Sequence, residues 1–289
     1  MTVRYGVIGN PIAHSRSPLI HRAFAEQTGV DLDYMAILAP LDGFNATVAQ
    51  FRSEGGLGLN VTVPFKAEAF ALCATLSERA QRAGAVNTLI FPADSRSSDV
   101  SSDIRGDNTD GVGLLRDLAF HQIQLKGKKV LLLGAGGASR GVLAPLLAER
   151  PARLLIANRR AATAEQLATD FQDLADTQLG ACALDTLPAE PFDLIINATS
   201  ASLSGKQLPL PDALIGQNTT VYDMAYGRAP TVFMQWGAAL GATAFDGLGM
   251  LVEQAAESFY LWHGIRPQTD HVRDLLKGSA DLFGASRLG

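Results

Sequence analysis

The sequence predicts an α/β fold with two domains, each built on a mostly parallel β-sheet. Three observations lead to this prediction. Short apolar runs alternate with segments of helical periodicity before residue 110. A strand, a glycine turn, a helix and a second strand follow within residues 129–160. The length of 289 residues accommodates two domains of ordinary size or one large domain.

Composition narrows the class of protein. The chain is 47% hydrophobic and 18% charged, which is typical of a globular protein with a sizeable core. A net charge of −5 argues against a general nucleic-acid-binding surface. Cys73 and Cys182 are isolated, so we expect neither a metal site nor a disulfide framework. The N-terminus lacks the apolar core of a signal peptide and no apolar run could span a membrane, which predicts a cytoplasmic protein.

The first part of the chain predicts strands that alternate with helices. Strands are expected at 3–8, 34–39, 57–63 and 85–91, and helices at 41–52 and in segments up to 82. A further helix is expected to begin with Ser17 as N-cap and Pro18 in the first helical position. The polar segment 92–103 predicts a hairpin loop, to which we assign no function.

The second part predicts a doubly wound, Rossmann-type domain. After a helix at 111–121, a buried strand at 130–133 leads into the glycine turn, a helix at 140–150 and a strand at 154–157. Later strands are expected at 181–184, 194–198 and 220–224, and two final helices at 250–263 and 269–276.

The glycine turn predicts a dinucleotide site. Gly134 and Gly136 allow the backbone to approach a pyrophosphate, and the following helix N-terminus favours the phosphate charge. An NAD site usually carries an acidic residue at the end of the second strand, whereas this chain has Arg159 and Arg160 after Asn158. Two guanidinium groups suit the 2′-phosphate of NADP. The alternative is an ordinary glycine-rich turn followed by a solvated basic pair.

Several polar residues follow strands or begin helices. Each could have a catalytic or binding role, but each can also be explained by an ordinary structural role. Lys66 follows a strand, at the position where parallel sheets place ligand-binding loops, but it could be a solvated charge. Asp110 suits a helix N-cap, and helix capping alone explains Ser15 and Ser17. Asn87 could merely satisfy a strand end, and the segment Asn-Ala-Thr-Ser at 197–200 could be a plain turn between a strand and a helix. Gln254 could be an exposed helix residue.

Taken together, the motifs resemble the shikimate dehydrogenase family. They are HSRSP (14–18), NVTVPFK (60–66), GAVNT (84–88), GDNTDG (106–111), GAGGASRG (134–141), ANRR (157–160), NATS (197–200), DMAYG (223–227) and DGLGMLVEQA (246–255). The resemblance runs from residue 3 to about 267, and the motifs follow the order and spacing of the family. Such an ordered set is far more specific than any one of its motifs.

The resemblance implies a domain division and a reaction. A split substrate domain, 1–111 plus 246–289, would surround an NADP-binding Rossmann domain at 112–245, with the active site in the cleft between them. The reaction would be the reversible, NADPH-dependent reduction of 3-dehydroshikimate to shikimate. Residues implied to form the binding site of this small-molecule substrate are Ser15, Ser17, Thr62, Lys66, Asn87, Asp110, Tyr226 and Gln254.

The resemblance also assigns the proton chemistry and the cofactor contacts. Lys66 would act on the transferred proton, with Asp110 beside it to orient the ammonium. Alternatively, Lys66 would act mainly by electrostatic stabilisation. Residues implied to contact NADP are Glu78, Gly134, Ala135, Gly136, Gly137, Ala138, Asn158, Arg159, Arg160, Thr163, Met224 and Gly247.

One departure from the family pattern affects the cofactor site. Arg160 stands where the common NADP form has threonine, and Thr163 stands where that form has a later arginine. The phosphate clamp would then be rebuilt from Arg159 and Arg160.

Other functions fit the sequence less well. The paralogous quinate/shikimate dehydrogenase accepts quinate and can use NAD, and the pairs at 159–160 and 15–17 favour the shikimate-specific NADP form over it. A non-catalytic NADP-binding regulatory protein is disfavoured by Lys66 and Asp110, and the motifs of a folate-linked dehydrogenase of similar layout do not match. We expect neither nucleic acid nor membrane as a partner, and both monomer and homodimer are open.

Overall fold

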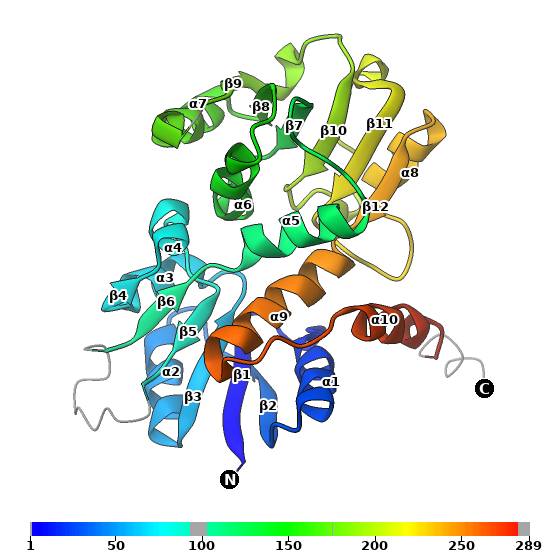
Figure 1. The fold of residues 1–289 in the computed structure, drawn as a ribbon. Helices are drawn as coiled ribbons and strands as arrows, with labels where there is room; N and C mark the ends of the chain where they lie inside the picture. The colour runs from blue at the N-terminus through cyan, green and yellow to red at the C-terminus, as the bar shows by residue number, and fades with distance from the viewer. Residues whose placement is uncertain (1, 93–102, 175, 283–289) are drawn as a thin grey trace. The chain divides into compact units, whose positions relative to one another are not determined.

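The structure is a computed structural model, and it describes residues 2–92, 103–174 and 176–282. The chain divides into two compact units, residues 1–113 with 252–289 (unit 1) and residues 114–251 (unit 2). The chain passes between the units within helix α5 (Asp110–Phe120) and again within helix α9 (Leu248–His263) (Figure 1). Each unit is therefore described on its own.

Unit 1 contains a six-stranded sheet in the order β2-β1-β3-β5-β6-β4. The strands are β1 (Val3–Gly9), β2 (Leu32–Leu38), β3 (Gly56–Val61), β4 (Thr75–Leu76), β5 (Thr88–Ile90) and β6 (Arg105–Asp107). β1 pairs in parallel with β2 and β3, whereas β5 is antiparallel to both of its neighbours, β3 and β6. The predicted hairpin loop falls on residues 93–102, which lie outside the described residues.

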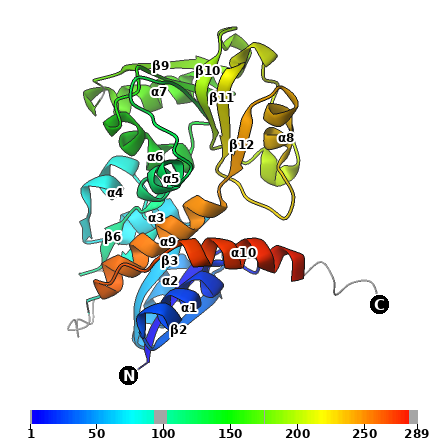
Figure 2. The ribbon, with the colours of Figure 1, turned by 45° about the vertical axis from the view of Figure 1, so that its right-hand side comes forward.

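Helices of unit 1 pack on both faces of this sheet. They are α1 (Ser17–Thr28), α2 (Phe44–Ser53), α3 (Lys66–Leu72), α4 (Glu78–Ala83) and α10 (Asp270–Leu282), with most of α9. Because side chains of a strand alternate between faces, Ile8 of β1 packs with Phe44 and Phe65 from α2 and the start of α3, whereas Tyr5 packs against Trp262 of α9. Figure 2 shows α1 and α10 side by side, and the two helices are in contact.

Unit 2 is doubly wound. Its sheet has the order β12-β11-β10-β7-β8-β9, and each neighbouring pair in it is parallel. The strands are β7 (Lys129–Leu133), β8 (Arg153–Asn158), β9 (Gln178–Ala183), β10 (Phe192–Asn197), β11 (Ile215–Asp223) and β12 (Thr243–Asp246). The strand order reverses between β7 and β10, and ligands of such sheets bind outside the carboxyl ends at this switch point.

Alternate residues of β7 supply two separate cores in unit 2. Val130 and Leu132 pack with α6 (Gly137–Ala148) and α7 (Ala161–Asp170), whereas Leu131 and Leu133 pack on the other face with Phe233 of α8 (Val232–Ala239). The four apolar residues of β7 are fully buried. A strand covered on both faces needs such a continuous apolar run, which is what the sequence contains.

Several element limits differ from those predicted. The second strand begins at Leu32, and β5 covers only residues 88–90 of the expected 85–91. Helix α2 begins at Phe44 instead of residue 41, and α6 begins at Gly137 instead of Arg140. The short strands β4 and β12 were not predicted. Strand β4 has only two residues, and β12 is a half-exposed edge strand, so neither has a recognisable apolar pattern.

The predicted N-cap of the first helix is wrong. Helix α1 begins at Ser17 itself, its N-cap is Arg16, and no side chain caps it. Ser15 Oγ instead accepts a hydrogen bond of 3.3 Å from the backbone N–H of Ser17. Pro18 lies in the first turn, where its missing N–H costs no helical hydrogen bond.

Candidate active site

The carboxyl ends of β1 and β3 lie side by side in unit 1, since Ile8 is paired with Val61. The backbone N–H of Thr62 donates to the Ile8 carbonyl at 3.0 Å, so Thr62 stands directly at this edge. Its Cγ2 atom covers Gly9, where a Cβ atom would lie only 2.5 Å away. Glycine at position 9 therefore lets the loops after both strands approach each other, at the edge where α/β sheets bind ligands.

Ser15 and Ser17 lie in the loop and first helical turn that follow β1. Ser15 is half-buried and Ser17 is buried. The hydroxyl of Ser17 hydrogen-bonds to the phenol of Tyr34, whose pKa is raised well above its usual value because burial disfavours the phenolate. Tyr34 in turn donates to Asn60 Oδ1 at 2.8 Å. Ser17 is thus tied to the interior of unit 1.

Lys66 and Asp110 form an ion pair, with Nζ and Oδ2 2.6 Å apart. Lys66 opens α3 just after β3, and Asp110 opens α5 just after β6. The Lys66 side chain is 24% exposed and that of Asp110 is 9% exposed, so the ammonium is the more accessible member. The other carboxylate oxygen of Asp110 accepts from Asn87 Nδ2 at 2.8 Å. Each oxygen of the carboxylate thus has a fixed donor.

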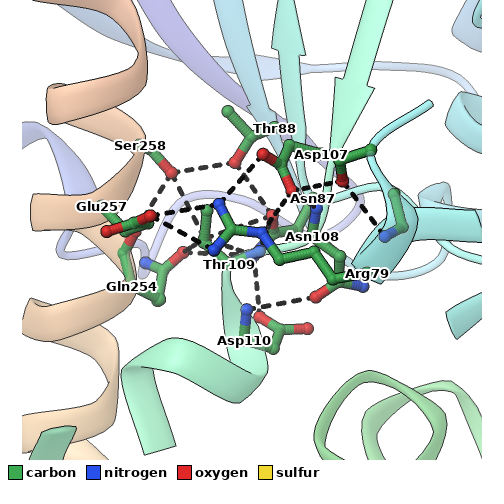
Figure 3. Close-up of polar contacts among 12 residues, drawn as sticks. Arg79, Asn87, Thr88, Asp107, Asn108, Thr109, Asp110, Gln254, Glu257 and Ser258 are labelled. Atoms are coloured by element: carbon green, nitrogen blue, oxygen red, sulfur yellow. Dashed lines mark hydrogen bonds and ion pairs between the residues drawn. The ribbon is translucent and has the colours of Figure 1, made fainter. Parts of the chain in front are cut away.

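Asn87 lies between Asp110 of this ion pair and Gln254 of α9 (Figure 3). Its Oδ1 atom accepts from the backbone N–H of Thr109 at 2.9 Å, and this donor fixes which end of the amide faces that way. Nδ2 therefore faces Asp110, and it also lies 3.4 Å from Oε1 of Gln254. The structure brings together four predicted residues from distant parts of the sequence, namely Lys66, Asn87, Asp110 and Gln254.

A second group of polar residues beside these four was not predicted. Arg79 contacts Asp107 and Glu257, and Ser258 bonds to Thr88 at 2.8 Å. These pairs are separated by 28, 178 and 170 residues in the sequence, so no local spacing could reveal them. The sequence carried no signal for Asp107, because its neighbours Arg105, Asn108 and Thr109 are polar and only the structure shows that its carboxylate is buried and needs a partner.

The glycine turn of unit 2 has the shape that a dinucleotide phosphate needs. Gly134 has φ +102°, and a Cβ there would lie 3.1 Å from the Thr199 side chain. Gly136 and Gly137 are exposed at the start of α6, with open space where a Cβ would stand. Ser139 occupies the third glycine position of the pattern, and its buried hydroxyl donates to the Gly134 carbonyl at 2.8 Å. The turn therefore leaves free N–H groups at a helix N-terminus.

The basic pair lies at the carboxyl end of β8, before α7. Arg159 and Arg160 are exposed, and among the described residues neither guanidinium forms an ion pair or a hydrogen bond. Arg160 is the N-cap residue of α7, and Thr163 lies in the first turn of that helix. Asn158 donates from Nδ2 to the backbone carbonyl of Arg160 at 3.1 Å, which holds the turn. Two free guanidinium groups beside a helix N-terminus fit a phosphate.

Met224 and Gly247 meet at the carboxyl ends of β11 and β12. A Cβ on Gly247 would lie 2.2 Å from the Met224 carbonyl oxygen, so only glycine fits. The N–H of Gly247 donates to the Ala225 carbonyl at 3.1 Å. The N–H of Ala225 donates to the buried carboxylate of Asp223 at 3.1 Å. Both ends of Ala225 are thus held, which fixes Met224 on one side and Tyr226 on the other.

Two predicted residues belong to a different unit from the groups with which they were expected to act. Tyr226, implied to bind substrate, belongs to unit 2, whereas the Lys66 group belongs to unit 1. Glu78, implied to bind the cofactor, belongs to unit 1 and is exposed at the start of α4. Within the described ranges, no set of three or more His, Cys, Asp or Glu residues could hold a metal ion. In the same ranges, no helix is long and apolar enough to cross a membrane.

Comparison with known proteins covers most of the chain. The family described as shikimate dehydrogenase substrate binding domain matches residues 7–89. The family described as shikimate/quinate 5-dehydrogenase matches residues 117–204, and the shikimate 5′-dehydrogenase C-terminal domain matches residues 247–277. A relative from Nitrosospira multiformis, named shikimate dehydrogenase (NADP(+)), is 53% identical over 96% of this chain and 98% of its own.

Solved structures agree with these matches. An Ael1 enzyme from Pseudomonas putida is 46% identical, with a TM-score of 0.86 over 95% of this chain and 98% of its own. Shikimate 5-dehydrogenase from Thermus thermophilus, in complex with NADP(H) and shikimate, is 32% identical, with a TM-score of 0.83 over 96% of this chain and 99% of its own. On these likenesses, which extend over nearly the whole sequence, the chain belongs to the shikimate dehydrogenase family.

Proposed function

We propose that this protein is an NADP-dependent shikimate dehydrogenase that reversibly reduces 3-dehydroshikimate to shikimate. The observation that carries the proposal is the Lys66–Asp110 ion pair, joined by Asn87 to Gln254, in a member of this family. Relatives more than 50% identical over nearly the full length are named shikimate dehydrogenase (NADP(+)). The reaction belongs to the shikimate pathway, which leads to chorismate and the aromatic amino acids.

Lys66 moves the proton. During reduction, its ammonium gives a proton to the carbonyl oxygen that becomes the hydroxyl of shikimate, and in the reverse direction its amine takes the proton back. Asp110 holds Nζ at 2.6 Å and so orients the ammonium. Because its other oxygen is bonded to Asn87, the carboxylate cannot rotate freely. Nζ is the more exposed partner, which leaves its remaining N–H bonds available to substrate.

The other substrate contacts follow from the chemistry of a small ring with one carboxylate and several hydroxyls. Ser15 and Ser17 donate hydrogen bonds to the carboxylate, from the loop after β1. Thr62, Asn87, Asp110 and Gln254 bind ring hydroxyls, and Tyr226 completes the pocket. In this proposal residues 1–111 with 246–289 are the substrate domain, and residues 112–245 bind NADP. The predicted cleft between the two domains stays a prediction.

NADPH supplies the hydride when it is bound. The exposed N–H groups at Gly136 and Gly137 bind its pyrophosphate, with Gly134, Ala135 and Ala138 forming the rest of the turn. Arg159 and Arg160 bind the 2′-phosphate, supported by Asn158 and Thr163. Met224 and Gly247 hold the nicotinamide end, and Glu78 contributes from unit 1.

An alternative within the family is a quinate/shikimate dehydrogenase that also uses NAD. The free guanidinium groups of Arg159 and Arg160 favour NADP over NAD, because NAD has no group to neutralise them. A non-catalytic NADP-binding protein would not need the ion pair of Lys66 and Asp110. The cytoplasmic location and the oligomeric state, monomer or homodimer, stay predictions.

The test is to follow reduced-nicotinamide absorbance while the purified protein meets shikimate or quinate, each with NADP or with NAD. The proposal expects turnover with shikimate and NADP, and little with the other three pairs. Comparable turnover of quinate, or with NAD, would assign the chain to the broader enzyme. No turnover with any pair, while NADP still binds, would favour the non-catalytic protein.

A further inference from the structure

Arg79 holds two buried carboxylates at once (Figure 3). Its Nε donates to Asp107 Oδ1 at 2.6 Å and its Nη2 to Asp107 Oδ2 at 2.9 Å, a bidentate contact. Nη1 and Nη2 also reach Glu257 Oε1, at 3.2 and 3.1 Å. The Asp107 and Glu257 side chains are only 9% and 8% exposed. Glu257 also contacts Arg266, whose Nη2 lies 2.9 Å from its Oε2.

The two carboxylates belong to the segments that carry two proposed substrate residues. Asp107 ends β6, three residues before Asp110. Glu257 lies in α9, three residues after Gln254 and so nearly one helical turn away. The guanidinium therefore joins the β6–α5 corner to α9. On the inner side, Asn87 Nδ2 reaches both segments, at 2.8 Å from Asp110 and 3.4 Å from Gln254.

Asp107 also links the guanidinium of Arg79 to the backbone of Asp110 through hydrogen bonds. Its Oδ1 accepts hydrogen bonds of 2.6 Å from the Ser77 hydroxyl and from the backbone N–H of Asn108. The side-chain oxygen of Asn108 then accepts from the N–H of Asp110 at 3.1 Å. A continuous set of contacts thus runs from Arg79 to the first residue of α5.

We propose that Arg79 is a positioning residue that sets the distance between Asp110 and Gln254, and with it the fit of the substrate ring. This inference rests on the proposed function of the same site. Without the guanidinium, two poorly exposed carboxylates would face each other across the gap that it fills, and their repulsion would separate α9 from the β6–α5 corner. A lysine would supply the charge but could not bond bidentately to one carboxylate while reaching the other.

Arg79→Ala tests the proposal through the steady-state kinetics of shikimate oxidation with NADP. The shikimate KM should rise about tenfold or more, because the spacing of the ring ligands is lost. The kcat should stay within about threefold, because Lys66 remains bonded to Asp110 and Asn87 still fixes that carboxylate. A role in stability alone would lower the unfolding temperature without separating KM from kcat in this way.

A matched control removes a comparable ion pair at the opposite end of β6. Arg52 contacts both oxygens of Asp103, at 2.7 and 2.8 Å, and the two side chains are 11% and 22% exposed. Arg52→Ala should lower the unfolding temperature while leaving the shikimate KM within about twofold of wild type. The two variants together separate loss of an ion pair from loss of position.

Two further variants make the outcome specific to charge and geometry. Glu257→Gln in the Arg79→Ala background removes the repulsion and adds an amide donor, so it should recover about threefold or more of the lost KM. Arg79→Lys keeps the charge without the fork, and its KM should lie between those of wild type and Arg79→Ala. If Arg79→Ala does not fold, the KM of Arg79→Lys carries the test.

An Arg79→Ala KM that matches the Arg52→Ala control, in an active wild-type background, refutes the positioning role and leaves the proposed function intact. The same holds if a non-folding Arg79→Ala is accompanied by an Arg79→Lys variant with wild-type KM. A wild-type protein that does not turn over shikimate refutes the proposed function, and this inference with it.

Discussion

Gly247→Ala is the substitution whose effect can best be calculated from the structure. The added Cβ would lie 2.2 Å from the carbonyl oxygen of Met224 and 2.7 Å from its carbonyl carbon. Ordinary contact begins at 3.4 Å, and both obstructing atoms are backbone, so the two segments must separate by about 1 Å. That separation would also stretch the 3.1 Å hydrogen bond from Gly247 to Ala225. The change acts on the segment that carries Met224 and Tyr226.

A misplacement of about 1 Å can reduce an enzyme's rate about a hundredfold, and we expect a loss of this order in kcat/KM for shikimate oxidation. The assay is steady-state absorbance with both substrates varied. Gly180→Ala is the matched control, because a Cβ there would lie 3.4 Å from Leu155 Cδ1, an ordinary contact, in the same unit. A Gly247→Ala enzyme within about threefold of this control would show that the close approach has no functional consequence.

Three other predictions concern the proton, the cofactor and pH. Lys66→Ala should cut turnover about 10²–10⁴-fold with smaller changes in substrate binding, whereas Lys126→Ala, an exposed lysine, should not; near-normal turnover would remove Lys66 from the mechanism. Arg159→Ala should weaken NADP binding about ten- to a hundredfold in a fluorescence titration and leave NAD little changed, because one charge-assisted contact is worth about 1.5–3 kcal/mol; equal losses would contradict a 2′-phosphate contact. Burial lowers the pKa of His21 from 6.5 to about 3, with the charge of nearby His263 adding to the effect. Because the unfolded chain then binds the proton more tightly, the contribution of His21 is fully present above pH 6.5 and is lost as pH falls towards 3. Urea unfolding should show this loss, His21→Phe should flatten it, and an unchanged slope in that variant would assign it to other groups.

The parts of the molecule that the sequence predicted well depend on local chemistry. The run 130–133 is apolar at every position because β7 is covered on both faces, and this can be recognised without knowing its neighbours. The glycine turn is similar, since Gly134 needs a positive φ and the next glycines open a helix. By contrast, β12 is a half-exposed edge strand, and its sequence of Thr-Ala-Phe-Asp has no continuous apolar run.

The start of α6 shows why helix limits were less certain. The expected start was Arg140, yet the helix begins at Gly137, although glycine has low helical propensity. The first N–H groups of a helix find no acceptor within the helix, and glycine there leaves them accessible to an acceptor on a ligand. The early start of this helix and the phosphate binding proposed for this turn therefore have the same physical origin.

Motif order identified Lys66, Asn87, Asp110 and Gln254, but it could not reveal what holds them. Glu257 is 178 residues from Arg79, and both lie in helices whose local patterns are ordinary. A carboxylate that is buried in the fold needs a cation or hydrogen-bond donor near it, but the sequence does not show which of the 24 lysines and arginines supplies it. Only the fold selects Arg79, because it places α4 beside the end of β6.

The fold also determines the orientation of the Asn87 side-chain amide. The motif predicts an amide near the proposed catalytic carboxylate, but an amide can donate or accept there, and the two orientations have opposite effects on Asp110. The backbone N–H of Thr109, 2.9 Å from Oδ1, can only donate, so Nδ2 must face Asp110. An amide oxygen in that place would repel the carboxylate and weaken its hold on Lys66. One backbone N–H from a neighbouring loop thus sets the polarity of the proposed catalytic pair.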